Sequence, residues 1–143
     1  MLYRFYGADS VGDLPLNPNY PKTRNPKDLY DAFSKAWCRE TCAPRMQPEW
    51  SEANMTLGQC SISSLIVQDL YGGEIYGILL PSGAYHCFNK IGDMVFDLTS
   101  EQFGDVVLDY SHPVLQSREE HLRSPEKKAR YELLKKRLLA QLK

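Results

Sequence analysis

One stretch, residues 57–70, constrains the fold of this chain more than any other. Apolar residues recur in it at the spacing of a helix that is covered on most sides. They are Ile62, Leu65, Ile66, Val67 and Leu70. Cys60 stands in the first turn of the predicted helix, just after Gly58, where a glycine allows the chain to turn sharply. Gly72 and Gly73 are expected to end the helix.

The start of this helix favours a reactive cysteine. Three serines, Ser61, Ser63 and Ser64, suit a helix start because their hydroxyls can accept from unpaired backbone N–H groups. A thiol there lies near the positive end of the helix dipole, which favours the thiolate. Taken alone, however, a cysteine on an apolar helix is more often a small hydrophobic core residue. The catalytic interpretation of Cys60 therefore depends on the residues that follow it.

Length and composition limit the classes of function. With 143 residues, the chain is expected to form one domain, residues 1–143, with a real core. A net charge of −1 gives no reason to expect nucleic acid or an anionic membrane as partner. No apolar run is long enough to span a bilayer, and the first residues lack the apolar core of a secretion signal. We therefore expect a cytoplasmic protein whose four cysteines are thiols.

Upstream of the cysteine helix the sequence predicts a lead-in and one helix. Residues 1–26 hold four prolines and several turn-forming residues, which is typical of irregular structure. Apolar residues at helical spacing then predict a helix from Lys27 to about Arg39. Pro44 and Pro48 break the following segment, so it is expected to be mostly loop.

Downstream, three short apolar segments separated by turn residues predict strands over residues 74–80, 85–91 and 94–99. With the Cys60 helix packed on them as an antiparallel sheet, they predict an α+β fold. A last amphipathic helix is predicted over residues 124–143, with its lysines and arginines on a solvated face. Its leucine stripe should dock on the rest of the domain or on a second copy of the chain, which would form a homo-oligomer.

The second predicted hairpin can be tested for geometry. A two-residue loop at Gly92 and Asp93 sets a register in which Phe88 pairs with Asp97. Because side chains alternate along a strand, His86 then shares a face with Asp97 as its diagonal neighbour, within reach of a hydrogen bond. A loop one residue longer or shorter would turn Asp97 to the other face.

A cysteine on a helix, a histidine on one strand and an aspartate on the next suit nucleophilic catalysis by a thiol. In such a triad His86 takes the proton of Cys60, and Asp97 orients the imidazole and stabilises its charge. His86 could instead be a hydrogen-bonded core histidine. A partly buried carboxylate nevertheless needs a partner, and His86 is the nearest candidate for Asp97.

Acyl transfer also requires hydrogen-bond donors for the oxyanion of the tetrahedral intermediate. The backbone N–H of Cys60 is one candidate. The side chains of Gln59 and Asn54 are candidates for the second donor, and Asn89 could support the site. Gln59 has an ordinary interpretation as a polar loop residue, and Asn89 as a residue that faces solvent.

The order of cysteine helix, histidine strand and aspartate strand resembles the core of the papain-like clan, which includes transglutaminase-like and NlpC-type cysteine hydrolases. A longer set of residues is similar to a small bacterial family called YunG-like. It comprises Trp37, Thr41, Trp50, Gly58-Gln59-Cys60, Val67-Gln68-Asp69, Gly72-Gly73, His86, Asn89 and Asp97-Leu98-Thr99 with Gln102-Phe103. The chain departs from it at Cys87, where an aromatic residue is expected. The resemblance covers about residues 29–104. It implies a papain-like core and a cysteine hydrolase or acyltransferase for a peptide or small amide, but no particular substrate.

Two other classes of function stay open. One is a non-catalytic binding module that keeps the papain-like frame. The other is a metal site, in which Cys38 and Cys42 would combine with Cys60, His86 and Cys87. This pattern contains no CxxC pair, and adjacent residues of a strand point to opposite faces. We therefore expect no metal and no cofactor, and we place the hydrolase ahead of the binding module.

Overall fold

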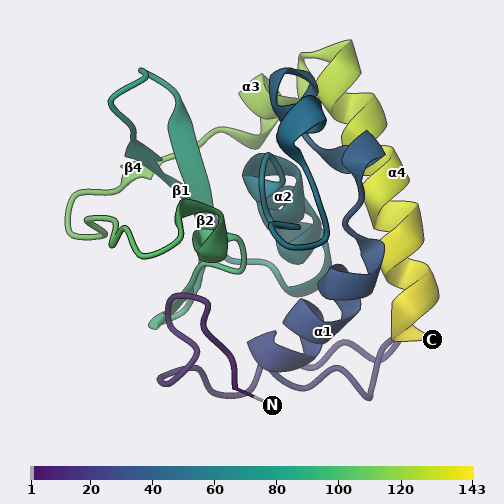
Figure 1. The fold of residues 1–143 in the computed structure, drawn as a ribbon. Helices are drawn as coiled ribbons and strands as arrows, with labels where there is room; N and C mark the ends of the chain where they lie inside the picture. The colour runs from purple at the N-terminus through teal and green to yellow at the C-terminus, as the bar shows by residue number, and fades with distance from the viewer. Residues whose placement is uncertain (1) are drawn as a thin grey trace.

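The computed structural model describes residues 2–143 and has an α+β fold, in which helices lie against one antiparallel sheet (Figure 1). The strands are β1 (Glu74–Leu79), β2 (Tyr85–Ile91), β3 (Met94–Phe96) and β4 (Val114–Leu115), in the order β3-β2-β1-β4. The α-helices are α1 (Pro26–Ala36), α2 (Cys60–Tyr71), α3 (Arg118–Leu122) and α4 (Pro125–Leu142). Short 3₁₀ helices span Arg39–Thr41, Pro44–Glu49 and Ser100–Phe103.

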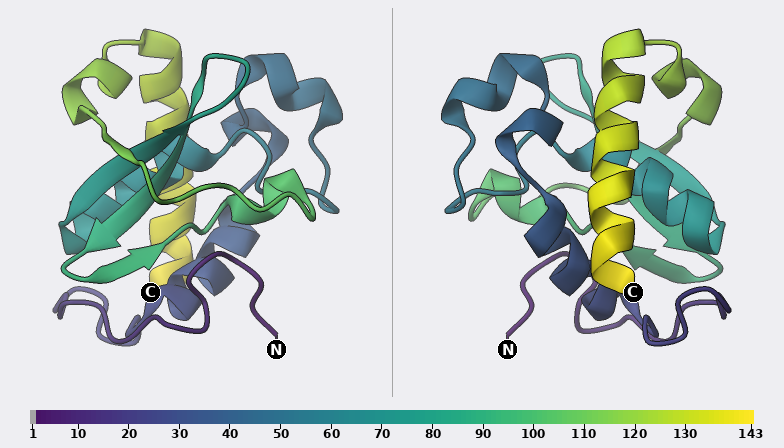
Figure 2. Two further views of the ribbon diagram at one scale, coloured as in Figure 1. Left: turned by 90° about the vertical axis from the view of Figure 1, so that its left-hand side faces the viewer. Right: turned by 90° about the vertical axis from the view of Figure 1, so that its right-hand side faces the viewer.

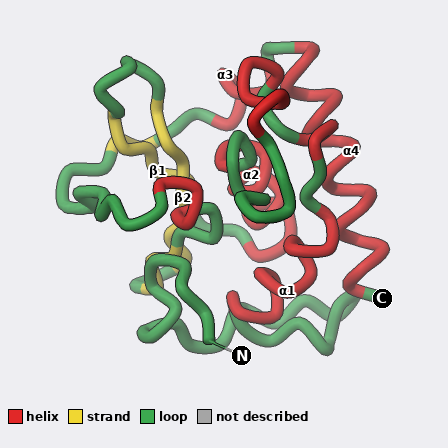
Figure 3. Tube along the Cα trace, viewed as in Figure 1, coloured by secondary structure: helices red, strands yellow, loops and turns green. Residues whose placement is uncertain are grey.

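Helix α2 lies at the centre of the molecule. Figure 1 shows the sheet on one side of it and α1 and α4 on the other, and Figure 3 shows the same separation of strands and helices. The turned views of Figure 2 show α4 running along the helical side, where it contacts both α1 and α2. Ile62, Leu65 and Ile66 of α2 are completely buried. A helix covered from two sides explains why its apolar arc is so broad.

The sharp turn predicted before α2 is present. Gly58 has a φ of 70°, and a Cβ at this position would lie 2.6 Å from Sγ of Cys42. The backbone conformation and the close approach both require glycine. The turn delivers the chain to Cys60, the first residue of α2.

The predicted capping of α2 by serine is wrong. The N-cap residue is Gln59, and its side chain makes no capping hydrogen bond within the described chain. Ser63 has a tertiary partner instead, since its Oγ accepts from Nε1 of Trp37 on the neighbouring helical layer, at 2.9 Å. The first backbone N–H groups of α2 therefore lack a side-chain cap at the end that carries Cys60.

The β2–β3 hairpin has the predicted register, with Asn89 opposite Phe96. Strand β3 nevertheless ends at Phe96 rather than at Thr99. The backbone N–H of Asp97 donates to the carbonyl of Tyr6 at 3.0 Å, so the N-terminal segment takes the place of β2 as its partner. The hairpin is thus shorter than predicted, but its register still fixes the position of Asp97.

Helix α4 docks on its own chain, which was one of the two expected arrangements. Leu134, Leu138 and Leu142 of the predicted stripe are buried, whereas Leu133 is 38% exposed. The expectation that every basic residue of this helix is solvated is wrong for Arg130, which is 8% exposed because it binds inside the fold. Among residues 2–143, even this longest helix is not long and apolar enough to cross a membrane.

Candidate active site

His86 and Asp97 form the buried part of the site. Nε2 of His86 lies 2.6 Å from Oδ2 of Asp97, and both side chains are only 1% exposed. His86 belongs to β2, and Asp97 directly follows β3, so the register of the hairpin brings the two together. This is the contact that the diagonal arrangement predicts.

Further donors hold the carboxylate of Asp97 in place. The hydroxyl of Tyr110 donates to Oδ2 at 2.6 Å, and the backbone N–H and the hydroxyl of Thr99 donate to Oδ1 at 3.2 and 3.3 Å. The ring of Tyr110 stacks on Tyr6 and meets Phe88 edge-on. Burial and the charge of Asp97 raise the pKa of Tyr110, which keeps the phenol protonated and able to donate.

The other side of the His86 ring faces the cysteine. Asp97 occupies Nε2, so Nδ1 is the nitrogen left to interact with Cys60, which lines the same cavity as His86. Gln102 lies beside the same nitrogen, with its Nε2 3.5 Å from Nδ1, and donates to the carbonyl of Thr99 at 3.0 Å. Phe103 packs edge-on against the imidazole. The ring is thus positioned from several sides.

The thiol of Cys87 also contacts Cys60, and these neighbours shift the protonation of the site. The hydrogen bond from Cys87 lowers the pKa of Cys60 well below its ordinary value; burial opposes the shift, and His86 reinforces it. Burial lowers the pKa of His86, but hydrogen bonds and charges from Asp97 and Cys60 outweigh it and raise this pKa to about 10. A thiolate beside an imidazolium is the arrangement these shifts favour at neutral pH.

A cavity of ≈ 690 Å³ opens beside Cys60 and His86. It lies among the segment before α2, the β1–β2 turn, the 3₁₀ helix after β3 and the start of α4. Its apolar lining includes Pro44, Met46, Leu57, Leu80 and Phe103. Of the cysteines in residues 2–143, Cys60 alone lines it, and Cys60 is partly exposed. A bound molecule would therefore meet this sulfur.

The predicted supporting residues lie outside this cavity. Gln59 is completely buried, and its Nε2 donates to the carbonyl of Cys38 at 3.0 Å, so it anchors the start of α2. Asn54 belongs to the preceding loop and does not line the cavity. Asn89 does not face solvent, because its Nδ2 donates to the buried carbonyl of Ser64 at 3.0 Å and ties β2 to α2. The structure thus brings together the three residues predicted as catalytic. The three residues predicted to support them, Gln59, Asn54 and Asn89, lie elsewhere.

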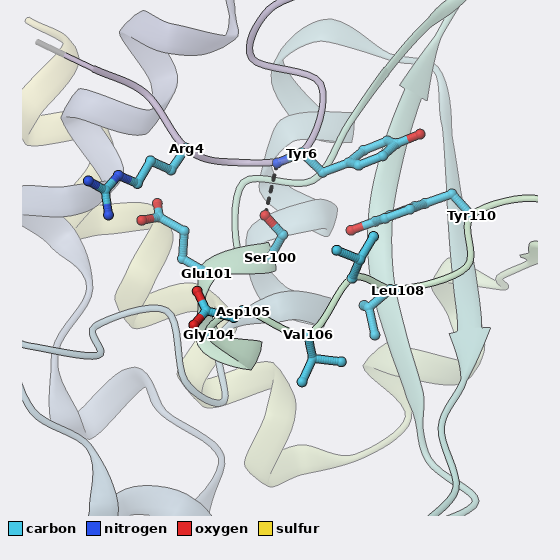
Figure 4. A pocket seen from close by; sticks show the side chains of 10 residues that line it. Arg4, Tyr6, Ser100, Glu101, Gly104, Asp105, Val106, Leu108 and Tyr110 are labelled. Carbon is cyan, nitrogen blue, oxygen red and sulfur yellow. Dashed lines mark hydrogen bonds between the residues drawn. The ribbon is translucent and has the colours of Figure 1, made fainter.

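A second, smaller cavity of ≈ 350 Å³ lies on the side of Tyr110 (Figure 4). Figure 4 shows the rings of Tyr6 and Tyr110 lying face to face at one end, with Ser100 accepting from the backbone N–H of Tyr6. Neither Cys60 nor His86 lines this cavity. It is therefore separate from the cavity beside Cys60.

The structure does not support the alternative of a metal site among residues 2–143. Within residues 2–143, no group of three or more histidine, cysteine, aspartate or glutamate side chains is arranged to hold a metal ion. Cys38 and Cys42 are free thiols, and neither lines the cavity beside Cys60.

Comparison with known proteins agrees with the family resemblance in the sequence. The profile of the YunG protein family matches residues 25–143. The chain belongs to the YunG family. Uncharacterized protein YunG of Bacillus subtilis (strain 168) is 34% identical to it over 88 residues, which is 62% of this chain and 70% of that protein. No solved structure matches. The family match includes α3 and α4, which lie beyond the residues that carry the sequence resemblance.

Proposed function

We propose that this YunG-family protein is a cysteine hydrolase or acyltransferase for amide or peptide bonds, built on a papain-like frame. Cys60 is the nucleophile, His86 the general acid and base, and Asp97 the residue that orients the histidine. The observation that carries the proposal is the buried hydrogen bond between His86 and Asp97, next to a cavity that His86 and Cys60 line together.

The first half of the reaction forms a thioester. The thiolate of Cys60 attacks the carbonyl carbon, and the electron pair of the C=O bond moves to the oxygen. As the tetrahedral intermediate collapses, the C–N bond breaks and the imidazolium of His86 gives its proton to the leaving amine. His86 is then neutral, with Asp97 still bound to Nε2. The proton that leaves is the one on Nδ1, the nitrogen that faces Cys60.

The second half releases the acyl group. Neutral His86 takes a proton from water, or from an amine in a transfer reaction, as that nucleophile attacks the thioester. The C–S bond then breaks and restores the thiolate–imidazolium pair. Two donors are proposed for the oxyanion in both halves. One is the backbone N–H of Cys60 at the uncapped start of α2, and the other is the N–H of the Gln102 side chain that is not donated to Thr99.

A non-catalytic binding module is the competing function, because a buried histidine–aspartate pair can be purely structural. Two features favour catalysis. The cysteine that meets the cavity is the one whose pKa is lowered, and His86 links it to a carboxylate that the fold keeps out of water. A binding module has no need for either feature.

The test needs no substrate. The rate of Cys60 alkylation by iodoacetamide is measured between pH 4 and pH 10 by mass spectrometry of the Cys60 peptide, in the native chain, in His86→Ala and in His112→Ala. His112 is an exposed loop histidine and serves as the matched control. We expect the native chain and His112→Ala to react well below the ordinary thiol pKa of about 8.5, and His86→Ala to require a higher pH than either of them. A Cys60 that titrates as a free thiol with or without His86 would leave the binding module as the better interpretation.

A further inference from the structure

The wall of the Cys60 cavity carries an excess of positive charge. Besides His86 and His121, its charged lining residues are Arg45, Glu126, Lys127 and Arg130. Glu126 forms an ion pair with Arg130, which is 8% exposed and also donates to the carbonyl of Thr41 at 3.2 Å. Arg45 and Lys127 make no ion pair within residues 2–143. In a chain with a net charge of −1, this local excess is a property of the cavity.

Neighbouring side chains fix the position of Lys127. Its Nζ lies 3.0 Å from Nδ1 of His121, whose Nε2 lies 3.2 Å from Oε1 of Gln116. An ammonium group can only donate, so Nδ1 accepts and the ring proton is on Nε2, which donates to Gln116. Burial and the charge of Lys127 lower the pKa of His121, which keeps this ring neutral. His121 thus accepts from one of the three N–H donors of the Lys127 ammonium group.

A series of side-chain contacts connects Lys127, through His121 and Cys87, with Cys60. His121 lies against Cys87, with Sγ and Nε2 3.8 Å apart, and Cys87 in turn contacts Cys60. Lys127 and Cys60 line the same cavity. A cation in a partly enclosed site attracts an anion more strongly than the same cation in open water does.

We propose that the cavity selects acyl substrates that carry a free carboxylate, with Lys127 and Arg45 binding the carboxylate while the reacting carbonyl lies at Cys60. This inference rests on the proposed function for the chemistry at Cys60, and it adds the substrate class: a small amide or a peptide with a carboxylate close to the scissile bond. The apolar lining receives the uncharged part of such a molecule.

The test compares two reagents that differ in charge. Iodoacetate and iodoacetamide alkylate the same sulfur, but only iodoacetate carries a carboxylate. The ratio of their rates at Cys60 is measured at low ionic strength and neutral pH, by mass spectrometry of the Cys60 peptide. The variants are Lys127→Gln, Arg45→Gln and, as the matched control, Lys128→Gln, which removes the charge of the next residue of α4. Lys128 is exposed and does not line the cavity.

We expect Lys127→Gln to lower the iodoacetate-to-iodoacetamide ratio by about threefold to tenfold, and Arg45→Gln to lower it less because its side chain is more exposed to screening solvent. Lys128→Gln should leave the ratio close to that of the native chain. The glutamine of Lys127→Gln can still donate to His121, so a changed ratio reports charge and not a lost contact. Equal ratios in Lys127→Gln and Lys128→Gln would overturn the inference. A slow, unactivated iodoacetamide reaction in every protein would instead count against the proposed function, because that rate measures the thiolate alone.

Discussion

The two sides of the His86 ring have opposite surroundings. On the Nε2 side, Asp97 is 1% exposed and accepts hydrogen bonds from Tyr110 and Thr99 as well as from the ring. On the Nδ1 side, Cys60 is partly exposed and meets a cavity. The closed side can set the pKa and orientation of the ring, because nothing there has to move when a substrate binds. The open side has to admit the substrate and release it.

This difference separates two kinds of mutational effect. Changes on the closed side should lower the rate for every substrate alike, because they act through His86. Changes on the open side, such as Lys127→Gln, should alter which molecule reacts and leave the thiolate itself in place. The predictions below test whether the two sides are as independent as their contacts indicate.

The largest effect is expected at the sulfur. Cys60→Ala should lower the hydrolysis of any acyl substrate found by screening by about 10,000-fold or more, because no other cysteine of residues 2–143 lines the cavity to form the thioester. His86→Ala should be nearly as damaging, since residues that act as a unit do not lose rate additively. The matched control is Cys38→Ser, a partly exposed thiol that does not line the cavity. Activity that survives Cys60→Ala but not Cys38→Ser would move the nucleophile elsewhere.

Asp97→Asn should have the next largest effect, a loss of about 100- to 10,000-fold in kcat with some activity retained. The native profile should fall at acid pH as Cys60 takes up a proton, and at alkaline pH as His86 loses its proton, at about 10. Asp97 raises the pKa of His86, so removing its charge should move the alkaline limb to lower pH. Asp93→Asn, in the exposed turn of the same hairpin, is the control. An alkaline limb that stays in place would mean that Asp97 does not act through the ring.

On the closed side, the sequence predicts the contact between His86 and Asp97, because local structure sets it. A two-residue turn fixes the register of β2 and β3, and that register brings Asp97 to the side of the sheet on which His86 lies. Tyr110 follows Asp97 by 13 residues in an irregular segment, so neither spacing nor periodicity points to its hydrogen bond. The early end of β3 depends on Tyr6, which is still more distant in sequence.

The partners of the polar side chains around α2 and along α4 are harder to predict, because they come from other parts of the chain. Ser63 suits a helix cap by type, but Trp37 is its actual partner. Arg130 resembles the solvated residues around it, yet it reaches the carbonyl of Thr41 and is buried. Gln59 carries a polar amide next to Cys60, and its amide N–H donates to the backbone carbonyl of Cys38 in another segment. In each case a long-range contact overrides the local preference.

Helix α4 contributes leucines to the core and Lys127 to the wall of the Cys60 cavity. We expect mutations in the core part to leave the cavity part unaffected. Leu138→Ala should lower the free energy of unfolding by about 2–5 kcal/mol, because its buried side chain leaves a cavity between α4 and the other helices. It lies about three helical turns from Lys127, so the alkylation ratio of the folded protein should not change. Leu133→Ala, at a largely exposed neighbour, is the control for denaturant unfolding. A changed ratio in Leu138→Ala would show that the core and the cavity wall are coupled.

The smallest effect is expected from mutation of Tyr110, whose hydroxyl donates to the carboxylate of Asp97. Tyr110→Phe removes the donor to Oδ2 of Asp97 but keeps the ring, which stacks on Tyr6 and meets Phe88 edge-on. His86 and Thr99 still bind the carboxylate, so its position loosens without being lost.

We expect Tyr110→Phe to cost about 1–2 kcal/mol of stability, as for a lost hydrogen bond to a charged group, and to lower kcat by about threefold to tenfold. Tyr6→Phe is the matched control, because it removes an exposed hydroxyl from the other ring of the stacked pair. Denaturant unfolding and kcat are measured for both variants. If Tyr110→Phe changes neither quantity more than Tyr6→Phe does, the hydrogen bond from Tyr110 is dispensable, and the imidazole and Thr99 alone hold the carboxylate. The closed side would then end at Asp97, and the stacked tyrosines would serve only to keep water away from it.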